Sequence, residues 1–525
     1  MTTQSTVPTT AGQGRLLFIQ CLLVLAAVFL LYRPALEYGF VWDDHLYVER
    51  NPAVQSWEHA GKAFTSPLES WGANAQYNMA AWRPIRNISY LIDHSLYGLN
   101  PMGWHLTNII LHGAAALMLL ALLRWVARQV AETGGLSNAA GWLCCGLAMV
   151  WAVHPAQTEV VAWVKSRDDL LATPLLFGAL WMLLARPGRW APLIAVLVVY
   201  PLALLSKENA IILPGLYAAA IVYLVSRRPN REQVVTLALL TLVTVAFLLL
   251  RHVVLGRTTQ AEVPGESAFQ AVWTMLHAFA KYVQITVWPW PPTTLLADYD
   301  GFPIAERVGN PGSLVGLALL AAVVAGALGG LVRRGWSVAG LGCAVYLVAL
   351  FPFSNLVPMM QIMADRFLYI PLIAVPIVLL GLSTGRQAKA FYAAALTMAV
   401  LVPAMAVATH GRLPVWESDI ALFTANHRDN PASWRPADHL VKAHLKEGNT
   451  TTALELATRN LSAYPNDTDI VRTAALSHLM AGNLEAGTSL TLLAVQMQPN
   501  DPRASATLQN FYRLREQQMT AENQP

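Results

Sequence analysis

Long apolar runs recur along this chain and constrain its fold more than any other feature. Eleven of them are long enough for a transmembrane helix, which needs roughly 17 to 25 residues. They lie near 15–36, 104–127, 138–154, 168–186, 189–206, 208–226, 232–255, 312–333, 337–355, 366–383 and 388–409. The chain is 55% hydrophobic and 13% charged, with a mean hydropathy of +0.42, which excludes an ordinary soluble enzyme. The sequence predicts an all-α, polytopic membrane protein.

Charge and cysteine usage exclude two further classes of protein. The net charge of +4 comes from arginines between the apolar runs, so it concerns membrane topology, and nucleic-acid binding has no support. The four cysteines lie inside apolar runs without the spacing of a metal site, so we expect neither disulfides nor zinc. They are Cys21, Cys144, Cys145 and Cys343.

Basic clusters indicate how the helices are oriented, because positively charged loops stay on the cytoplasmic side. We place these clusters there: Arg124 with Arg128, Arg186 with Arg189, Arg227 with Arg228 and Arg231, Arg333 with Arg334, and Arg386 with Lys389. A twelfth apolar stretch, 268–288, carries His277, Lys281 and Gln284 on one stripe, typical of an amphipathic helix. If it crossed the bilayer, the cluster at 333–334 would fall outside, so we predict that it does not span.

Eleven crossings place most polar loops on one face of the membrane. The run Leu16 to Tyr32 is followed by no small-residue cleavage site, so we interpret it as an uncleaved first span that starts inside. The extracytoplasmic face then receives the loops 37–103, 154–167, 206–208, 256–311 and 356–365, and everything after 410. We therefore predict a membrane domain over 1–410 with its active site on that face, and a soluble domain over 411–525.

The soluble part contains a repeat of 34 residues. Pro431, Pro465 and Pro499 follow this period. The pair His444-Leu445 recurs as His478-Leu479, and Gly448-Asn449 recurs as Gly482-Asn483. This is the period of tetratricopeptide helix pairs, and about two repeats plus a closing helix near 502–517 are present. Such repeats bind a peptide or partner on their concave face, although with so few units a structural brace is equally consistent.

Two adjacent acids follow the first predicted span, in the stretch FVWDDHLYVERNP from Phe40 to Pro52. Ionisable groups so close to a bilayer are costly unless they face a wet cavity or a partner. Asp43 and Asp44 are therefore candidate catalytic residues, suited to general-base work, although two adjacent acids also simply end a helix.

The remainder of the 37–103 loop and the next helix add bases. Arg83 lies in the stretch WRPI, and His105, Asn108 and His112 share one helix face at i, i+3 and i+7. A metal site would need a further carboxylate there. A hydrogen-bonded polar stripe near the mouth of the helix is the plainer interpretation.

The second outer loop gathers acids and bases between two apolar runs. His154, Glu159, Arg167, Asp168 and Asp169 lie within sixteen residues, more than a turn requires. We predict that Glu159, Arg167 or Asp168 contacts substrate. The alternative for Asp168 and Asp169 is that they stabilise the first turn of the next helix.

Two short polar motifs complete the outer face. Lys207 and Glu208 lie between two spans with almost no loop, where a snorkelling anchor is the alternative. Asp365 and Arg366 open a late helix, where Arg366 suits a phosphate. The alternative is that these two neighbours pair with each other and fix the start of the helix.

Six ordered motifs, taken together, resemble the transmembrane and tetratricopeptide-repeat O-mannosyltransferases and their bacterial relatives. They read FVWDDHLYVERNP, WRPIRNISYLID, LYGLNPMGWHLTNIILH, VHPAQTEVVAWVKSRDDLLA, LLSKENAIILP and MADRFLYIP, and the resemblance extends to the repeats that follow. It implies a GT-C-like helical bundle that transfers sugar from a polyprenyl-phosphate donor to an acceptor hydroxyl. The short repeat array suggests a bacterial relative, in the inner membrane with its active site and repeats on the periplasmic side.

The resemblance also implies roles for the residues above. The acidic motif assigns the general base to Asp43, with Asp44 orienting or binding, and their order can be reversed. Residues for the departing donor phosphate are Arg366, Arg83 and Lys207, assisted by His105 or His154. Contacts with sugar or acceptor fall to Glu159, Arg167, Asp168, Glu208 and Asp365, and His277 and Lys281 line access for the donor. A divalent cation is compatible with so many acids, but no ligand spacing requires one.

Three other functions are alternatives to this one. A transporter would place its charges near the bilayer midplane and often shows inverted repeats, whereas these polar groups lie on one face. A non-enzymatic scaffold recruiting partners through the repeats leaves the acidic and basic motifs unexplained. A transferase that modifies a lipid or polysaccharide is the alternative within enzymes.

Overall fold

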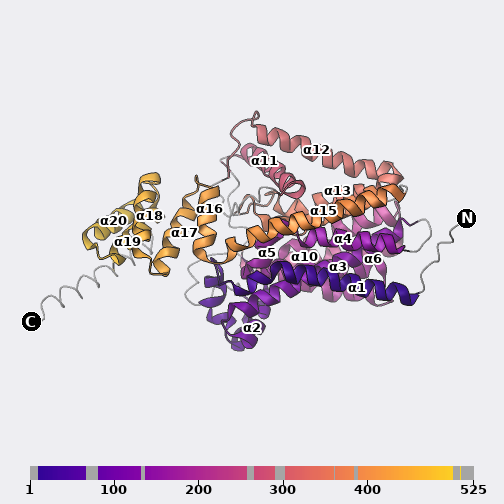
Figure 1. The fold of residues 1–525 in the computed structure, drawn as a ribbon, viewed down its shortest axis with the longest axis horizontal. Coiled ribbons are helices and arrows are strands. Elements are labelled where there is room, and N and C mark those ends of the chain that lie inside the picture. Colours follow the sequence, from indigo (N-terminus) through magenta and orange to yellow (C-terminus); the bar gives the residue numbers. More distant parts are fainter. Residues whose placement is uncertain are drawn as a thin grey trace, which may run out of the picture. The chain divides into compact units, whose positions relative to one another are not determined.

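The computed structural model of the chain describes residues 10–66, 81–131, 136–256, 265, 267–289, 302–359, 361–383, 388–499 and 509. Two compact units are present (Figure 1): residues 1–293 with 303–417, and residues 294–302 with 418–525. Every regular element in the described ranges is helical. An all-helical fold is therefore confirmed. The predicted closing helix near 502–517 and Arg386 lie outside the described residues, apart from position 509.

Seven helical segments in the described ranges are long and apolar enough to cross a membrane. They are Gly12–Glu37, Pro101–Gln129, Val164–Ala185, Glu208–Val225, Arg231–Leu255, Pro311–Val332 and Leu396–Trp416. An eighth is a pair, Asn138–Ala152 with Pro155–Ala162, that bends by 54°. The chain is thus a multi-pass membrane protein, as predicted.

Three of the eleven predicted spans form shorter helices. They are Ala191–Ser206, Ser337–Phe353 and Pro371–Ser383. The first is also irregular, because a π-helical turn at Ala195–Val199 precedes the helix Tyr200–Ser206, in which Pro201 cannot donate a backbone hydrogen bond. The count of eleven crossings therefore stays a prediction.

Helix α3 (Pro101–Gln129) forms the centre of the first unit, packing against α1 (Thr10–Tyr32), α4 (Asn138–Ala152) and α6 (Arg167–Ala185). Its start is fixed locally, since Pro101 occupies the first turn and the Asn100 side chain accepts from the backbone N–H of Met102. Helix α2 (Pro84–Tyr97) likewise begins with proline. These starts set the loops that carry the polar motifs.

The predicted non-spanning stretch forms α11 (Ala268–Val287), which packs along α12 (Pro311–Val332). A Cβ on Gly316 would lie 1.8 Å from the carbonyl oxygen of Leu276, so only glycine allows the two backbones to approach this closely. Although α11 has 20 residues, it is too polar to be one of the seven segments above. This agrees with the prediction that it does not span.

The second unit is a series of helices that repeat at the predicted period. They are α16 (Asp419–Asp429), α17 (Trp434–Lys446), α18 (Thr450–Ala463), α19 (Thr468–Met480) and α20 (Leu484–Met497). Starts at 434 and 468, and at 450 and 484, are 34 residues apart. Gly448 and Gly482 have φ of 76° and 82° at the equivalent turns, which L side chains rarely adopt. The assignment as tetratricopeptide repeats remains a prediction.

Candidate functional site

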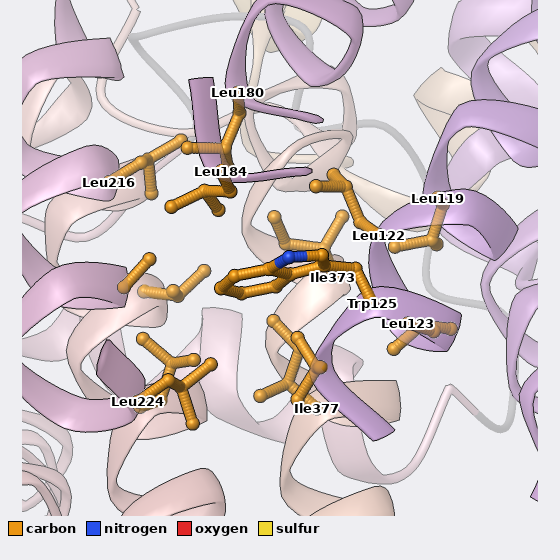
Figure 2. A pocket seen from close by; sticks show the side chains of 14 residues that line it. Leu119, Leu122, Leu123, Trp125, Leu180, Leu184, Leu216, Leu224, Ile373 and Ile377 are labelled. Atoms are coloured by element: carbon orange, nitrogen blue, oxygen red, sulfur yellow. The ribbon is translucent and has the colours of Figure 1, made fainter. Parts of the chain in front are cut away.

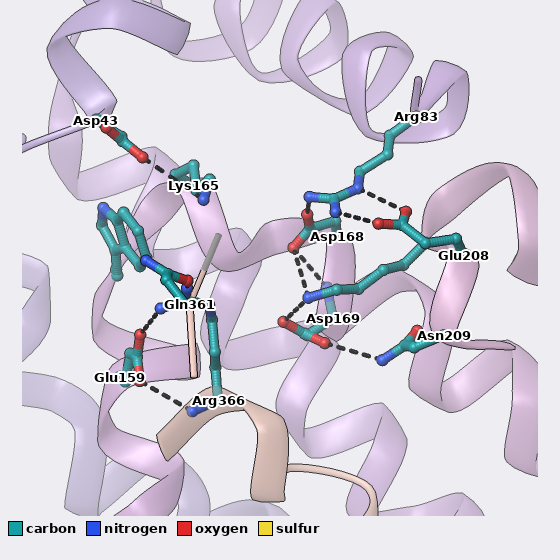
Figure 3. A network of polar contacts seen from close by, with 12 residues as sticks. Asp43, Arg83, Glu159, Lys165, Asp168, Asp169, Glu208, Asn209, Gln361 and Arg366 are labelled. Carbon is teal, nitrogen blue, oxygen red and sulfur yellow. Dashed lines mark hydrogen bonds and ion pairs between the residues drawn. The ribbon is translucent and has the colours of Figure 1, made fainter. Parts of the chain in front are cut away.

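The acid pair follows a strained residue in the loop after the helical segment that ends at Glu37. Trp42 has a φ of 52°, uncommon for a residue other than glycine and often found at functional sites. Its neighbour Asp43 is 21% exposed, and its carboxylate lies 3.5 Å from Nζ of Lys165 (Figure 3). Asp43 therefore points toward the 154–167 loop and stays accessible.

Asp44 is placed differently from its neighbour. Its side chain is fully buried and accepts the backbone N–H groups of Val41 at 3.2 Å and Lys165 at 2.8 Å. Asp44 thereby joins the first outer loop to the second. Burial, with a smaller contribution from Asp43, raises the pKa of Asp44 from 3.8 to about 7, although the two N–H bonds oppose the shift.

This raised pKa predicts a pH-dependent stability. Between pH 3.8 and about 7 the folded protein keeps a proton on Asp44 that the unfolded chain releases, so this residue stabilises the fold less as pH rises. We expect the melting temperature of wild type, minus that of Asp44→Asn, to fall from pH 4 to pH 7. Thermal unfolding of both proteins in one detergent measures it. A difference that is constant or grows with pH contradicts the assignment.

Arg83 is the centre of a network that connects three segments (Figure 3). Its guanidinium donates two bonds to Glu208, at 3.0 and 2.7 Å, and also pairs with Asp168. Burial opposes its charge, but Asp168 and Glu208 outweigh burial and raise the pKa of Arg83. The start of α2 is thereby fixed to α6 and to the 206–208 turn.

Lys207 extends this network. Its ammonium pairs with Asp169 and lies 3.6 Å from Asp168, and Asn209 donates to Asp169 at 3.3 Å. Asp168 and Asp169 thus neutralise bases from other segments, which goes beyond the alternative that they serve only the first turn of α6. Lys207 is buried, so the snorkelling alternative does not describe it.

Glu159 and Arg366 form a second buried pair, 207 residues apart in sequence. The Glu159 carboxylate also accepts the backbone N–H of Arg366 at 2.9 Å, and Gln361 accepts from the same guanidinium. Asp365 pairs instead with Arg412, at the end of α15 (Ala388–Arg412). The alternative that Asp365 and Arg366 pair with each other is therefore wrong: the 3₁₀ turn Asp365–Leu368 directs the neighbours to different partners.

Trp163 lies between the two pairs that contain Lys165 and Arg366. Its rings stack with Trp42 at 4.9 Å and with Trp416 at 5.6 Å. The Lys165 Nζ and the Arg366 guanidinium carbon lie 4.6 and 5.6 Å from its ring centroid, within cation–π range. Sequence reasoning missed these tryptophans, although each lies within three residues of a charged side chain.

Arg167, His105 and His154 each have a partner within the protein, and their predicted contacts with donor or acceptor stay predictions. Arg167 is buried, pairs with Asp93 at 2.7 Å and donates to the Trp104 carbonyl at 2.8 Å. The His105 ring lies 3.4 Å from the Gly39 carbonyl, and His154 Nδ1 accepts from the backbone N–H of Ala156. Their contacts hold the loops, and the hydrogen-bonded polar stripe is the arrangement observed.

The residues predicted for donor access lie on α11. Lys281 is exposed and donates to Gln284 at 3.4 Å. The His277 ring packs directly against Gly312 in α12, so closely that a Cβ at position 312 would overlap it. Among the described residues, no group of three or more His, Cys, Asp or Glu side chains is arranged to hold a metal ion.

An apolar pocket lies among the helices of the first unit (Figure 2). Leucine, valine, isoleucine and alanine line it, together with Trp125. With one indole nitrogen among its side chains, it offers nothing to orient a sugar or accept a proton. The charged network is therefore the candidate site.

The fold and this network define a multi-pass membrane protein with paired acids and bases at the ends of its helices. No family model matches the chain, and no solved structure does. The chain is similar to protein O-mannosyl-transferases of the TMTC type. It is 23% identical to TMTC3 of Mus musculus over 86% of this chain and 52% of that protein. It is 31% identical to Tmtc1 of Drosophila melanogaster over 35% of this chain and 21% of that protein.

A further relative is Tmtc2 of Drosophila melanogaster, 28% identical over 36% of this chain and 20% of that protein. The chain spans about half the length, or less, of these relatives. The resemblance drawn from the six motifs is confirmed at this level.

Proposed function

We propose that this protein is a membrane glycosyltransferase of GT-C type. It transfers a sugar from a polyprenyl-phosphate donor to a hydroxyl group on a protein acceptor, at the extracytoplasmic face. The relatives are named protein O-mannosyl-transferases, which makes mannose the first sugar to test. The predicted topology supports the extracytoplasmic face, and the short repeat array, which suggests a bacterial relative, supports the inner membrane and the periplasm.

One observation carries the proposal: the accessible Asp43 carboxylate lies beside Lys165, on a loop that packs against the other charged loops. It is 21% exposed and 3.5 Å from Lys165, whereas Asp44 is buried and accepts two backbone N–H bonds. A general base must reach the acceptor proton. We therefore assign the base to Asp43 and give Asp44 the role of a positioning residue.

The proposed reaction is a single displacement. Asp43 takes the proton of the acceptor hydroxyl while its oxygen attacks C1 of the sugar. The new C1–O bond forms as the bond from C1 to the phosphate oxygen breaks, and its electron pair leaves with polyprenyl phosphate. Attack opposite the leaving group inverts the anomeric centre.

The buried pairs have a supporting part in this proposal. Arg83, Lys207 and Arg366 each contact a carboxylate, so their positive charge is largely compensated before a donor binds. We propose that these pairs preorganise the site, which lowers the cost of reorganisation during the reaction. Glu208, whose side chain is 35% exposed, is the acid of this network that can accept a hydrogen bond from a sugar hydroxyl.

The second unit is proposed to bind the acceptor protein. Its helix pairs recur at 34 residues, and repeats of this kind present a concave surface for an extended peptide.

The test is a donor panel with purified full-length protein. Polyprenyl-phosphate mannose, glucose and galactose are each offered with a serine- and threonine-rich peptide, a polysaccharide or no acceptor. We expect sugar on the peptide from at least one donor. Transfer only to the polysaccharide would overturn the proposal of a protein acceptor. The absence of both transfer and hydrolysis with every donor would overturn the proposed function.

A further inference from the structure

Arg86 is a fully buried arginine whose charge has no acidic partner among the described residues. Its Nε and Nη2 both donate, at 3.2 Å, to the single amide oxygen of Asn87. Its Nη1 has no hydrogen-bond partner there. A water molecule can satisfy that N–H group but cannot neutralise a buried charge, which is costly unless it is paired.

Other arginine and lysine side chains that are buried or partly buried on these loops contact acids. Arg83, Arg167, Arg366, Arg412 and Lys207 each contact a carboxylate. Arg124 is also buried without an acid partner in the described ranges, but it lies inside α3 and not at a helix N-terminus, and it donates to Gln20 at 2.7 Å.

The position of Arg86 on its helix increases the cost of its charge. It is the third residue of α2 (Pro84–Tyr97), where the partial positive charge of a helix N-terminus disfavours a cation and favours an anion. The helix dipole and the guanidinium charge therefore add at one place, and among the described residues no carboxylate forms an ion pair with Arg86; Asp168 acts on it only from beyond contact.

Aromatic rings connect Arg86 to the proposed catalytic loop. Its guanidinium carbon lies 5.0 Å from the ring centroid of Tyr47 and 5.7 Å from that of Tyr90. Lys165, which pairs with Asp43, has its Nζ 5.8 Å from the same Tyr47 ring. Arg86 and Lys165, the partner of the proposed base, thus contact the same tyrosine ring.

We propose that Arg86, at the N-terminus of α2, completes an anion site for the phosphate of the lipid-linked donor. This rests on the proposed function. A guanidinium binds phosphate through two parallel N–H bonds, and the donor phosphate gains negative charge as its bond to the sugar breaks. An uncompensated cation stabilises that charge more than one already paired with a carboxylate.

Binding of undecaprenyl phosphate, with uncharged undecaprenol for comparison, tests the site without requiring transfer. The full-length protein is compared as wild type, Arg86→Gln, Arg86→Lys and the control Arg189→Gln, which changes an exposed arginine. We expect Arg86→Gln to weaken binding of undecaprenyl phosphate by about 10- to 100-fold, the value of hydrogen bonds to a charged group. Undecaprenol binding should not change, and Arg86→Lys should keep part of the affinity.

Stability separates this role from a structural one. Because Arg86→Gln removes an uncompensated buried charge, the melting temperature of the ligand-free variant should equal or exceed that of wild type. A large fall in melting temperature, or wild-type affinity for undecaprenyl phosphate in Arg86→Gln, would overturn the inference. If inorganic phosphate competes for the site as well as undecaprenyl phosphate does at the same concentration, the site binds free phosphate. That result would overturn the assignment to a lipid-linked ligand.

Failure of this inference and failure of the proposed function differ in outcome. If wild type transfers sugar and Arg86→Gln binds undecaprenyl phosphate normally, only the inference is overturned. If no donor is turned over while binding still depends on Arg86, the anion site is supported and the transferase is overturned.

Discussion

Replacing Asp43 by asparagine is expected to reduce sugar transfer by roughly 10²- to 10⁴-fold, the usual contribution of a general base. The amide keeps the shape of the side chain but cannot take the acceptor proton. Because Asp43 is 21% exposed and only 3.5 Å from Lys165, the change should leave expression and melting temperature near wild type. Transfer from a polyprenyl-phosphate sugar to peptide, in membranes or detergent, is the measurement.

A matched control lies on the same loop. Glu58 is an exposed acid, and Glu58→Gln should keep full activity. Full activity in Asp43→Asn would refute the assignment of the base. Loss in Asp44→Asn alone, with normal folding, would transfer the role to Asp44.

Replacing Arg366 by methionine is expected to destabilise the fold by about 3–5 kcal/mol, the typical cost of breaking a buried ion pair. The change leaves Glu159, whose side chain is 0% exposed, with a buried charge and one backbone N–H bond. It also removes the guanidinium that lies over Trp163 and Phe367. Thermal unfolding of the purified protein in detergent measures the loss.

The double variant Glu159→Gln with Arg366→Met isolates the cause. Once both charges are absent, much of the lost stability should return, because unpaired charge is the main penalty in the single variant. A single variant as stable as wild type would show that the pair is not the structural link between the second outer loop and the 365–368 turn. A double variant no better than the single one would attribute the loss to packing.

Two buried carboxylates connect loops that are distant in sequence. Asp44 and Glu159 both accept backbone N–H groups from a distant segment, Lys165 and Arg366 respectively. A carboxylate that binds main-chain donors fixes the path of a loop more firmly than one that binds flexible side chains. The site therefore depends on buried acids that do not touch a substrate as well as on an accessible one.

The sequence by itself determined the class of protein, most of its apolar helices and the period of its C-terminal helices. Apolar length depends only on composition, so the membrane helices follow from it directly. The 34-residue period predicted helix starts that recur at 434, 468, 450 and 484, because repeats are local patterns. The acid pair of the first loop was visible because charge next to an apolar run is costly.

Only the tertiary structure decided how the charged side chains pair. Arg366 contacts Glu159 across 207 residues, and Arg83 contacts Glu208 across 125; no period or spacing in the sequence encodes such contacts. Adjacent residues with the same carboxyl group, Asp43 and Asp44, differ in burial because the backbone N–H groups of Val41 and Lys165 bind Asp44 alone. Arg86 differs from the other arginines of these loops in that no carboxylate among the described residues forms an ion pair with it. Pairing and burial are long-range properties, fixed when the loops pack together, and this is why they emerge only from the folded structure.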